Sequence, residues 1–408
     1  MATLTRLKGQ KGNKSVLGLK VLMWVLYSER PLRAEELCHA MGVEIGSADL
    51  DPKNTPVVRT LQSSCLGLVT IEPSSSTVRL VHFTLQEYLL GNSTLFNSPQ
   101  ATIAEVCLTY LNFGSVRDLA PNLLSAPPAL ALLEYVSCHW GRHARMGMTE
   151  SAKTLALRLL YRFDEHISAQ LLLLDYEGVS AQLELPRWIE GPMGFTGLHG
   201  VSFLGIVEIV GDVLKMKEWD VNEIDCMGYT ALIGAAKEGH AEVVRILLKR
   251  DDVNPNIAVS EGRTALTWAA GEGYEEVMKV LLEREDINPN IPCTRGQNPL
   301  IWAADNGNSG VVKMLLERED VDPDPVDTGG RTPLWCAAGR GHSEIVKMLL
   351  EREDVNPNQA AQYCQTPLPS AAWSGNLEVV KMLLEREEVN PHHVPCRQLG
   401  PNASLVGC

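Results

Sequence analysis

Hydrophobic positions in the second half of the chain recur at a fixed interval. Pairs of leucines follow one another in steps of 34 residues, at Leu247-Leu248, Leu281-Leu282, Leu315-Leu316, Leu349-Leu350 and Leu383-Leu384. Glycines keep the same step in two series, at Gly239, Gly273, Gly307, Gly341 and Gly375, and at Gly228, Gly262, Gly296 and Gly330, with Cys364 in the fifth position of the second series. A constant period of this length is the signature of a repeat architecture.

One unit, residues 330–350, reads as a turn, a short helix, a glycine-containing corner and a second helix. Pro333 lies in the first turn of the first helix, where its missing N–H is not needed. In the second helix the apolar residues from Ile345 onward fall at i, i+1, i+4 and i+5 and form one face. A single unit cannot bury that face alone, so neighbouring units must stack. The pattern predicts a mainly α-helical solenoid.

The first half of the chain has a different pattern. Val21–Tyr27 is an apolar helix, a second helix opens at Pro31, and a third covers residues 57–66. Short apolar runs at 68–71 and 78–81 flank a Pro-Ser-Ser-Ser turn and predict a β-hairpin. Three helices followed by a hairpin is the order of a winged helix. The expected domains are therefore a flexible N-terminus (1–15), a winged-helix-like domain (16–98), a helical linker (99–194), the repeats (195–391) and an irregular tail (392–408).

The repeated motif G-x-T-P-L-x-x-A-A, followed by G-H and V-V-x-x-L-L, resembles the ankyrin repeat. The resemblance is close from Met227 to Pro391, and a weaker copy at Thr196–His199 is expected to form the N-terminal cap, which gives about six repeats. The family's histidine after T-P-L survives only as His199. The second helix ends in Glu-Arg-Glu-Asp followed by Val-Asn-Pro-Asn (Glu351–Asn358) where the family has a glycine, which predicts longer connecting fingers.

The net negative charge comes from the repeats alone. The chain has a net charge of -14, and residues 195–391 alone hold 32 Asp and Glu against 18 Lys and Arg. An acidic surface repels phosphate backbones, so we expect no nucleic-acid ligand for the repeats. The winged-helix-like domain is a poor DNA reader as well, because its third helix offers only Arg59 and its hairpin only Arg79.

Other classes of function lack their signatures. No apolar run reaches the roughly 18 residues of a membrane span, since Val16–Tyr27 is short and interrupted by Lys20. The ten cysteines form no C-x-x-C pair and read as structural thiols of a cytoplasmic protein. His139 and His143 lack a nearby carboxylate or thiol cluster, so no metal and no cofactor are expected. No catalytic constellation emerges, and the chain is not expected to be an enzyme.

The front half is also similar to the winged-helix region of fungal NACHT-type signalling proteins, which are switch NTPases that often end in ankyrin repeats. The residues that carry this resemblance are Glu29–Leu32, Glu35–Ala40, Val43–Gly46, Ser63–Val69 and Val81–Leu89. In animal relatives a histidine in the H-x-T/S-x-Q-E-F/Y context contacts the diphosphate of ADP, and the matching residue here is His82. The phosphate-binding sequence G-x-x-x-x-G-K-[ST] does not occur in the chain, so this role requires a nucleotide-binding module that the chain lacks.

The leading hypothesis is a scaffold that binds a protein partner through its ankyrin repeats. The alternative is the sensor half of a NACHT-type NTPase. We expect partner contacts at loop tips and inner first-helix positions, which are Tyr229, Lys237, Arg263, Glu272, Gln297, Asp305, Asn306, Arg331, Arg340 and Gln365. Trp268 and Trp302 occupy equivalent positions, and the sequence allows either packing between helices or an aromatic stripe on the binding surface.

Overall fold

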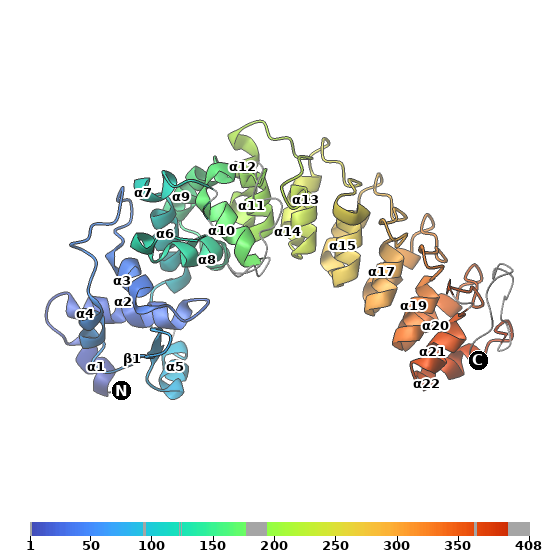
Figure 1. The fold of residues 1–408 in the computed structure, drawn as a ribbon, viewed down its shortest axis with the longest axis horizontal. Helices are drawn as coiled ribbons and strands as arrows, with labels where there is room; N and C mark the ends of the chain where they lie inside the picture. The colour runs from blue at the N-terminus through green and yellow to red at the C-terminus, as the bar shows by residue number, and fades with distance from the viewer. Residues whose placement is uncertain are drawn as a thin grey trace, which may run out of the picture. The chain divides into compact units, whose positions relative to one another are not determined.

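The computed structural model describes residues 2–92, 95–121, 123, 125–176, 194–362 and 365–390. It is mainly helical, as predicted, and divides into two compact units, Met1–Asp220 and Val221–Cys408 (Figure 1). The tail predicted for 392–408, the linker segment 177–193 and Cys364 lie outside the described residues.

The first unit begins with four helices, a hairpin and a fifth helix. Their bounds are α1 Ala2–Lys8, α2 Lys14–Tyr27, α3 Ala34–Gly42, α4 Val58–Ser64, β1 Val69–Ile71, β2 Val78–Leu80 and α5 Phe83–Leu90. The two strands pair antiparallel, with Val69 opposite Leu80. The segment 1–15, for which a flexible N-terminus was predicted, contains α1 and the start of α2. Leu7 of α1 is fully buried and packs beside Gly18 of α2, which gives this short segment a reason to stay folded.

A buried carboxylate ties the chain together at the start of α3. Glu36 is fully buried and accepts hydrogen bonds from both terminal nitrogens of Arg30 at 2.9 and 2.8 Å, and from the backbone N–H of Arg33 at 2.7 Å. A buried charge is tolerable only when it is paired and hydrogen-bonded in this way. Within the described ranges this arrangement occurs once, and it fixes the approach of the chain to α3.

The rest of the first unit is a helical layer around α6. The bounds are α6 Pro99–Leu111, α7 Gly114–Arg117, the 3₁₀ turn η2 Pro128–Leu130, α8 Leu133–Met146, α9 Glu150–Leu160, η3 Phe163–Glu165, α10 Ile167–Tyr176, α11 Gly197–Leu204 and α12 Val207–Met216. Helix α6 packs against α8 and α9, and Tyr110 near its end is fully buried. Helices α11 and α12, which hold the weak first repeat copy, pack against α9 of the same unit.

The second unit is a row of helix pairs. Its elements are α13 Ala231–Lys237, α14 Ala241–Leu248, η5 Ser260–Gly262, α15 Ala265–Glu272, α16 Glu275–Leu282, α17 Pro299–Asn306, α18 Ser309–Leu316, α19 Pro333–Arg340, α20 Ser343–Leu350, α21 Pro367–Trp373 and α22 Leu377–Leu384. The first helices of successive pairs pack on one another, from α13 to α21, and so do the second helices, from α14 to α22 (Figure 1). The solenoid predicted from the 34-residue period is present.

The loops after the second helices form what we call the Arg/Asn seam, residues 250–256, 284–290, 318–324 and 352–358. An arginine in each of the last three loops donates to a carbonyl at the end of the second helix one repeat earlier. Arg284 donates to Leu248 O at 3.0 Å, and Arg318 and Arg352 make the equivalent bonds at 3.0 and 3.1 Å. These carbonyls have no partner within their own helix. The arginine thus caps the C-terminus of the preceding second helix, at a point where the ankyrin family usually has a glycine.

Asparagines join the same loops. Asn256 donates to Asp286 O at 2.7 Å and accepts from Asn288 N–H at 2.8 Å. One side chain therefore makes both a donor and an acceptor bond to the loop of the next repeat. Asn290 and Asn358 make the corresponding pairs of bonds. Asp324 occupies the equivalent position and accepts from the next loop at 3.0 Å, but a carboxylate has no N–H to donate. Its Oδ1 atom is buried without a hydrogen-bond partner in the described part of the chain.

Candidate functional site

The first helices of four successive repeats, α13, α15, α17 and α19, start from the same cap. Thr230, Thr264, Asn298 and Thr332 each accept a hydrogen bond from the backbone N–H three residues on, at 3.0–3.2 Å. A side-chain oxygen at this position satisfies one of the open N–H groups of a helix start. In the weak first copy the threonine instead contacts histidine, with Thr196 Oγ1 2.8 Å from His199 Nδ1. The caps therefore hold the first helices in register without the missing histidines.

The turns in front of these helices are joined to one another. The backbone N–H of Thr294 donates to Glu261 O at 2.7 Å, Thr328 donates to Arg295 O at 2.9 Å, and Gln362 donates to Gly329 O at 2.8 Å. Each bond connects one repeat to the next, so the turn tips form a continuous row. Side chains on this row are consequently held at a fixed spacing.

Cations and aromatic rings alternate across three neighbouring repeats, in what we call the cation–aromatic row: Tyr229, Lys237, Trp268, Arg263 and Trp302. The Lys237 ammonium lies 4.5 Å from the centre of the Tyr229 ring and 4.8 Å from that of Trp268. The Arg263 guanidinium lies 4.6 Å from the Trp268 ring and 4.3 Å from the Trp302 ring. A cation over an aromatic face contributes about 1 kcal/mol when partly desolvated. All five side chains are half-buried, so the row is preformed and reaches the surface.

The tryptophans of the row both pack between helices and contribute to the surface, which are the two possibilities that the sequence left open. The indole Nε1 atoms of Trp268 and Trp302 are shielded from solvent and have no hydrogen-bond partner among the described residues, which is typical of packed rings. Their ring systems remain half-buried rather than buried and stack on cations from neighbouring repeats. The rings are therefore packed at their edges and accessible on part of their faces.

A shallow pocket follows further along the solenoid. It is lined by Thr328, Gly329, Arg331, Trp335, Ala361, Gln362 and Gln365. The Trp335 indole donates to Gln365 O at 3.1 Å, and the Arg331 guanidinium lies 5.8 Å from the Trp335 ring. Arg331 Nε also donates to Asp327 Oδ2 at 2.7 Å, and the Asp327 side chain is only 1% exposed. Arg331 is therefore fixed by a buried carboxylate, and the pocket combines one indole, one held guanidinium and two exposed amides.

An ion pair joins the last repeat of the cation–aromatic row, through α17, to the repeat of the pocket, through α19. Arg340 Nε and Nη2 donate to the two carboxylate oxygens of Asp305, both at 2.9 Å. The Arg340 side chain is 58% exposed and the Asp305 side chain 17% exposed, so Arg340 still presents much of its surface to solvent. The paired geometry raises the pKa of Arg340 further through the hydrogen bond to Asp305.

Comparison with known proteins identifies the repeats. The family model for ankyrin repeats matches three times, at residues 163–258, 252–327 and 318–393, which together cover more than half of the chain. The chain belongs to the ankyrin-repeat family. A second family model, described as the winged helix domain of GPI inositol-deacylase, matches residues 4–101. The predicted winged helix is therefore present in front of the ankyrin solenoid, and it extends further toward the N-terminus than expected.

Solved ankyrin-repeat structures are similar to part of the chain. The protein EF0377 is 26% identical with a TM-score of 0.43, over 46% of this chain and 96% of that one. An ankyrin repeat domain from Acinetobacter baumannii AYE is 25% identical with a TM-score of 0.42, over 46% and 96%. The ankyrin repeat domain of Bcl-3, a member of the IkappaB family, is 24% identical with a TM-score of 0.42, over 46% and 84%. A comparison with curated proteins gave no match.

Most predicted contact residues lie on the ankyrin surface just described. Tyr229, Lys237 and Arg263 belong to the cation–aromatic row, and Arg331 and Gln365 line the pocket. The others that reach solvent are Glu272, Asn306, Arg340 and the half-buried Asp305. Gln297 is a correction: it is only 5% exposed, so its side chain is not available to a partner. It occupies the position that Arg263 and Arg331 hold in their own repeats.

His82 has a local structural role in the winged helix. It is the N-cap of α5, with Nδ1 2.8 Å from Thr84 Oγ1 and 3.3 Å from Thr84 N. Its ring is exposed and stacks on Phe83 with a centroid distance of 5.1 Å. The cap leaves Nε2 of the imidazole with no hydrogen-bond partner among the described residues, so contact with a nucleotide stays a prediction.

Reactive groups in the described ranges are suppressed rather than activated. Burial raises the pKa of the Cys38 thiol to about 11 and that of Cys336 to about 12, so neither is a thiolate near neutral pH. Burial lowers the pKa of His143 to about 4, and the ring is held by Tyr135 Oη at 2.7 Å. The described residues contain neither a group of three or more side chains placed to hold a metal nor a helix long and apolar enough to cross a membrane.

Proposed function

We propose that the chain is a non-enzymatic scaffold that binds a protein partner through its ankyrin repeats. Solenoids of this kind present extended surfaces, and ankyrin repeats generally mediate contacts between proteins. The observation that carries the proposal is the cation–aromatic row, in which Arg263 lies between two half-buried tryptophans from successive repeats. Trp, Tyr and Arg are the residue types that dominate binding energy at protein interfaces.

The size and rigidity of the surface favour a macromolecule over a small ligand. The row and the pocket together extend from Tyr229 to Gln365, across all described ankyrin repeats of the second unit. Hydrogen bonds between turn tips hold these side chains before any partner arrives. A preorganised surface loses little conformational entropy on binding, so more of the contact energy appears as affinity. The partner is therefore expected to contact several repeats at once.

The test compares face variants of the full chain with a matched control. Lys237→Glu reverses the charge in the row, Arg340→Ala removes an exposed arginine, and Arg245→Ala removes an arginine of second helix α14 that makes similar exposed ion pairs. Proteins captured from the native cell extract are identified by quantitative mass spectrometry and re-bound in purified form. The proposal expects a partner retained by wild type and Arg245→Ala and lost by Lys237→Glu. Equal retention by all variants contradicts it.

The alternative is the sensor half of a NACHT-type signalling NTPase. What supports it is the order of parts, a winged helix at residues 4–101 followed by helices and ankyrin repeats. Under this alternative, His82 contacts the nucleotide diphosphate of an additional module. Sequencing the native transcript to its 5′ end tests the idea. An upstream reading frame with a phosphate-binding loop supports it, and an in-frame stop codon shortly before Met1 contradicts it.

A further inference from the structure

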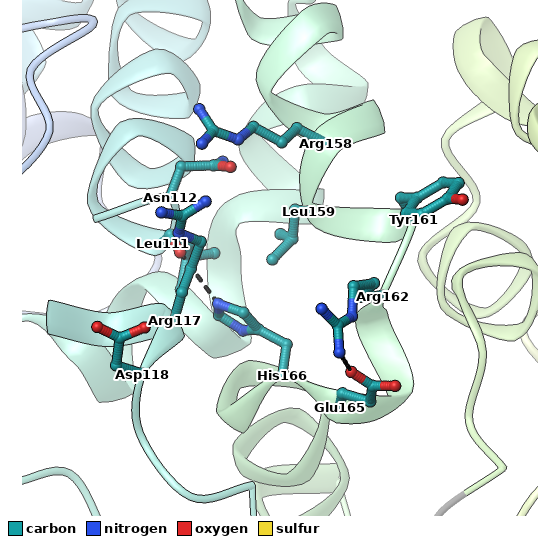
Figure 2. A pocket seen from close by; sticks show the side chains of 10 residues that line it. All are labelled: Leu111, Asn112, Arg117, Asp118, Arg158, Leu159, Tyr161, Arg162, Glu165 and His166. Atoms are coloured by element: carbon teal, nitrogen blue, oxygen red, sulfur yellow. Dashed lines mark hydrogen bonds and ion pairs between the residues drawn. The ribbon is translucent and has the colours of Figure 1, made fainter. Parts of the chain in front are cut away.

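A pocket lies in the helical layer of the first unit. It opens where the end of α6, α7, α9 and η3 meet (Figure 2). The polar residues that line it include Asn112, Arg117, Asp118, Arg158, Arg162, Glu165 and His166. Three arginines in one pocket of a chain whose net charge is -14 require a physical account.

The positive charge of this pocket is only partly neutralised. Arg162 forms an ion pair with Glu165. Arg117 and Arg158 make no hydrogen bond or ion pair with any residue that the structure describes. Figure 2 shows their guanidinium groups on the same side of the pocket, with Asn112 between them, while the carboxylate of Asp118 lies beyond the other end of the Arg117 side chain. Two unpaired cations converge on one opening and repel each other.

The wall beneath the two arginines is neutral and fixed. Burial, with a smaller contribution from Arg117, lowers the pKa of His166 to about 4, so the ring is uncharged at neutral pH. Its Nε2 lies 3.0 Å from Leu111 O, so that nitrogen carries the proton, and Nδ1 accepts from the backbone N–H of Ser168 at 3.2 Å. The histidine is therefore satisfied by the protein and contributes no charge.

The helices that carry the two arginines are locked together at the same place. The Asn112 amide donates to Leu108 O at 2.8 Å in α6 and to Leu155 O at 3.1 Å in α9. Helix α7, which bears Arg117, begins two residues after Asn112, and Arg158 lies in the last turn of α9. The backbone positions from which the two arginines extend are thus set by the fold before any ligand binds.

We propose that this pocket binds the phosphate group of a phosphomonoester between Arg117 and Arg158. A phosphomonoester carries a charge of about -1.5 to -2 at pH 7, which matches two unpaired guanidinium groups. The planar fork of arginine pairs with phosphate oxygens through two parallel hydrogen bonds. A carboxylate ligand balances only one of the two charges. The same chemistry is offered by a soluble phosphorylated metabolite and by the headgroup of a phosphorylated lipid.

The experiment uses the full chain and inorganic phosphate as the probe. Phosphate is titrated at constant ionic strength, maintained with NaCl, and binding is followed by calorimetry and by the shift of the thermal midpoint. The variants are Arg117→Gln, Arg158→Gln and the double substitution. Arg145→Gln is the control, because Arg145 is also exposed and makes no hydrogen bond or ion pair with any described residue, but lies outside the pocket. Midpoints without phosphate check that each variant is folded.

Wild type and Arg145→Gln are expected to bind phosphate equally. Each single pocket substitution weakens binding by about tenfold, because one charge-assisted pair is lost, and the double variant gives no saturable binding. The proposal is overturned if wild type shows no saturable binding, or if all variants respond equally, as they do to a general salt effect. Vesicles of phosphatidylcholine with and without phosphatidylinositol 4-phosphate then distinguish the sources: arginine-dependent flotation assigns the phosphate to a lipid, and its absence beside phosphate binding assigns it to a soluble ester.

Discussion

The two units of the molecule are stabilised in different ways. In the ankyrin unit one set of contacts is repeated, so the bond from Arg284 to the helix before it recurs at Arg318 and Arg352. In the first unit the important polar contacts occur once, as at the buried Glu36. A repeated contact supplies its own controls, because the same substitution can be made 34 residues away in a nearly equal environment. A unique contact has no such internal reference, and its loss is not shared with equivalent bonds.

The largest effect is expected at Glu36. Glu36→Ala leaves Arg30 and the Arg33 backbone N–H without their acceptor, and unfolding of the first unit should become easier by about 2–3 kcal/mol, since both arginines can turn partly toward solvent. Glu344→Ala on α20, an exposed first-turn position in the repeats, should cost less than about 0.5 kcal/mol. Urea unfolding with peptide-resolved hydrogen exchange measures both. Comparable losses of stability for the two variants would contradict the proposed difference between the first unit and the ankyrin unit.

Glu36 also gives the first unit a specific response to acid. Burial alone raises the pKa of this carboxyl, but the hydrogen bonds from Arg30 and from the Arg33 backbone outweigh it and hold the pKa below its usual 4.5. A lowered folded-state pKa means that the stability contribution is complete above pH 4.5 and is lost as pH falls through the lowered value. The stability difference between wild type and Glu36→Gln should therefore shrink on acidification below that pH.

Alanine scanning of two equivalent glycines separates backbone strain from contact between repeats. Gly341 and Gly375 both have positive φ, 81° and 76°. A Cβ atom at Gly341 would lie 2.6 Å from Asn376 Oδ1 in the next repeat, whereas nothing lies within 4 Å at Gly375. Gly341→Ala should cost about 2 kcal/mol and Gly375→Ala about 1 kcal/mol, the strain of a left-handed residue alone. Thermal unfolding measures both losses of stability. Equal losses would show that Asn376 in the following repeat moves aside without a cost in stability.

Repairing the Arg/Asn seam should stabilise the protein. Asp324→Asn supplies the missing N–H, which by the register of Asn256 and Asn290 would reach Asp354 O, and stability at pH 7 should rise by about 1 kcal/mol. Burial and the neighbouring Asp322 and Asp354 raise the pKa of Asp324 above its usual 3.8. Wild type therefore recovers this stability as pH falls, and the two proteins should converge below pH 3.8. Matched denaturation curves at both pH values test this, with Asn290→Asp as the reverse change.

The smallest effect on folding is expected at Arg340. Its ion pair with Asp305 is more than half exposed on the arginine side, so Arg340→Ala should change stability by less than about 0.5 kcal/mol. Its effect should appear in partner binding instead. A large stability loss measured by thermal unfolding would place Arg340 among the structural contacts of the solenoid and remove it from the proposed binding surface.

The sequence predicts the fold well because repetition amplifies weak signals. Helix positions, the hairpin and the solenoid follow from local pattern and from the 34-residue period. The short helix α1 was missed because its stability depends on Leu7 packing against α2, a contact that local pattern does not contain. The domain boundaries proposed for the remaining segments stay predictions.

Side-chain roles were predictable only in part. Arg263, Gln297, Arg331 and Gln365 share one position of the period, yet the first and third contact tryptophans, the second is buried and the fourth is exposed. Charge and length separate the two arginines from the two glutamines, but Gln297 and Gln365 are identical side chains, so their different burial depends on their surroundings. The pocket at Arg117 and Arg158 was not anticipated, because its residues come from four separate elements with no motif spacing.

The Arg/Asn seam also governs how such a chain can grow. Each of its bonds between repeats closes on a partner 30, 32, 34 or 36 residues away, in the adjacent repeat. Duplication or loss of one whole 34-residue segment therefore leaves every donor matched with an acceptor, whereas an insertion of any other length opens bonds on both sides. The seam therefore permits changes in the number of repeats and makes changes in the length of a single repeat destabilising.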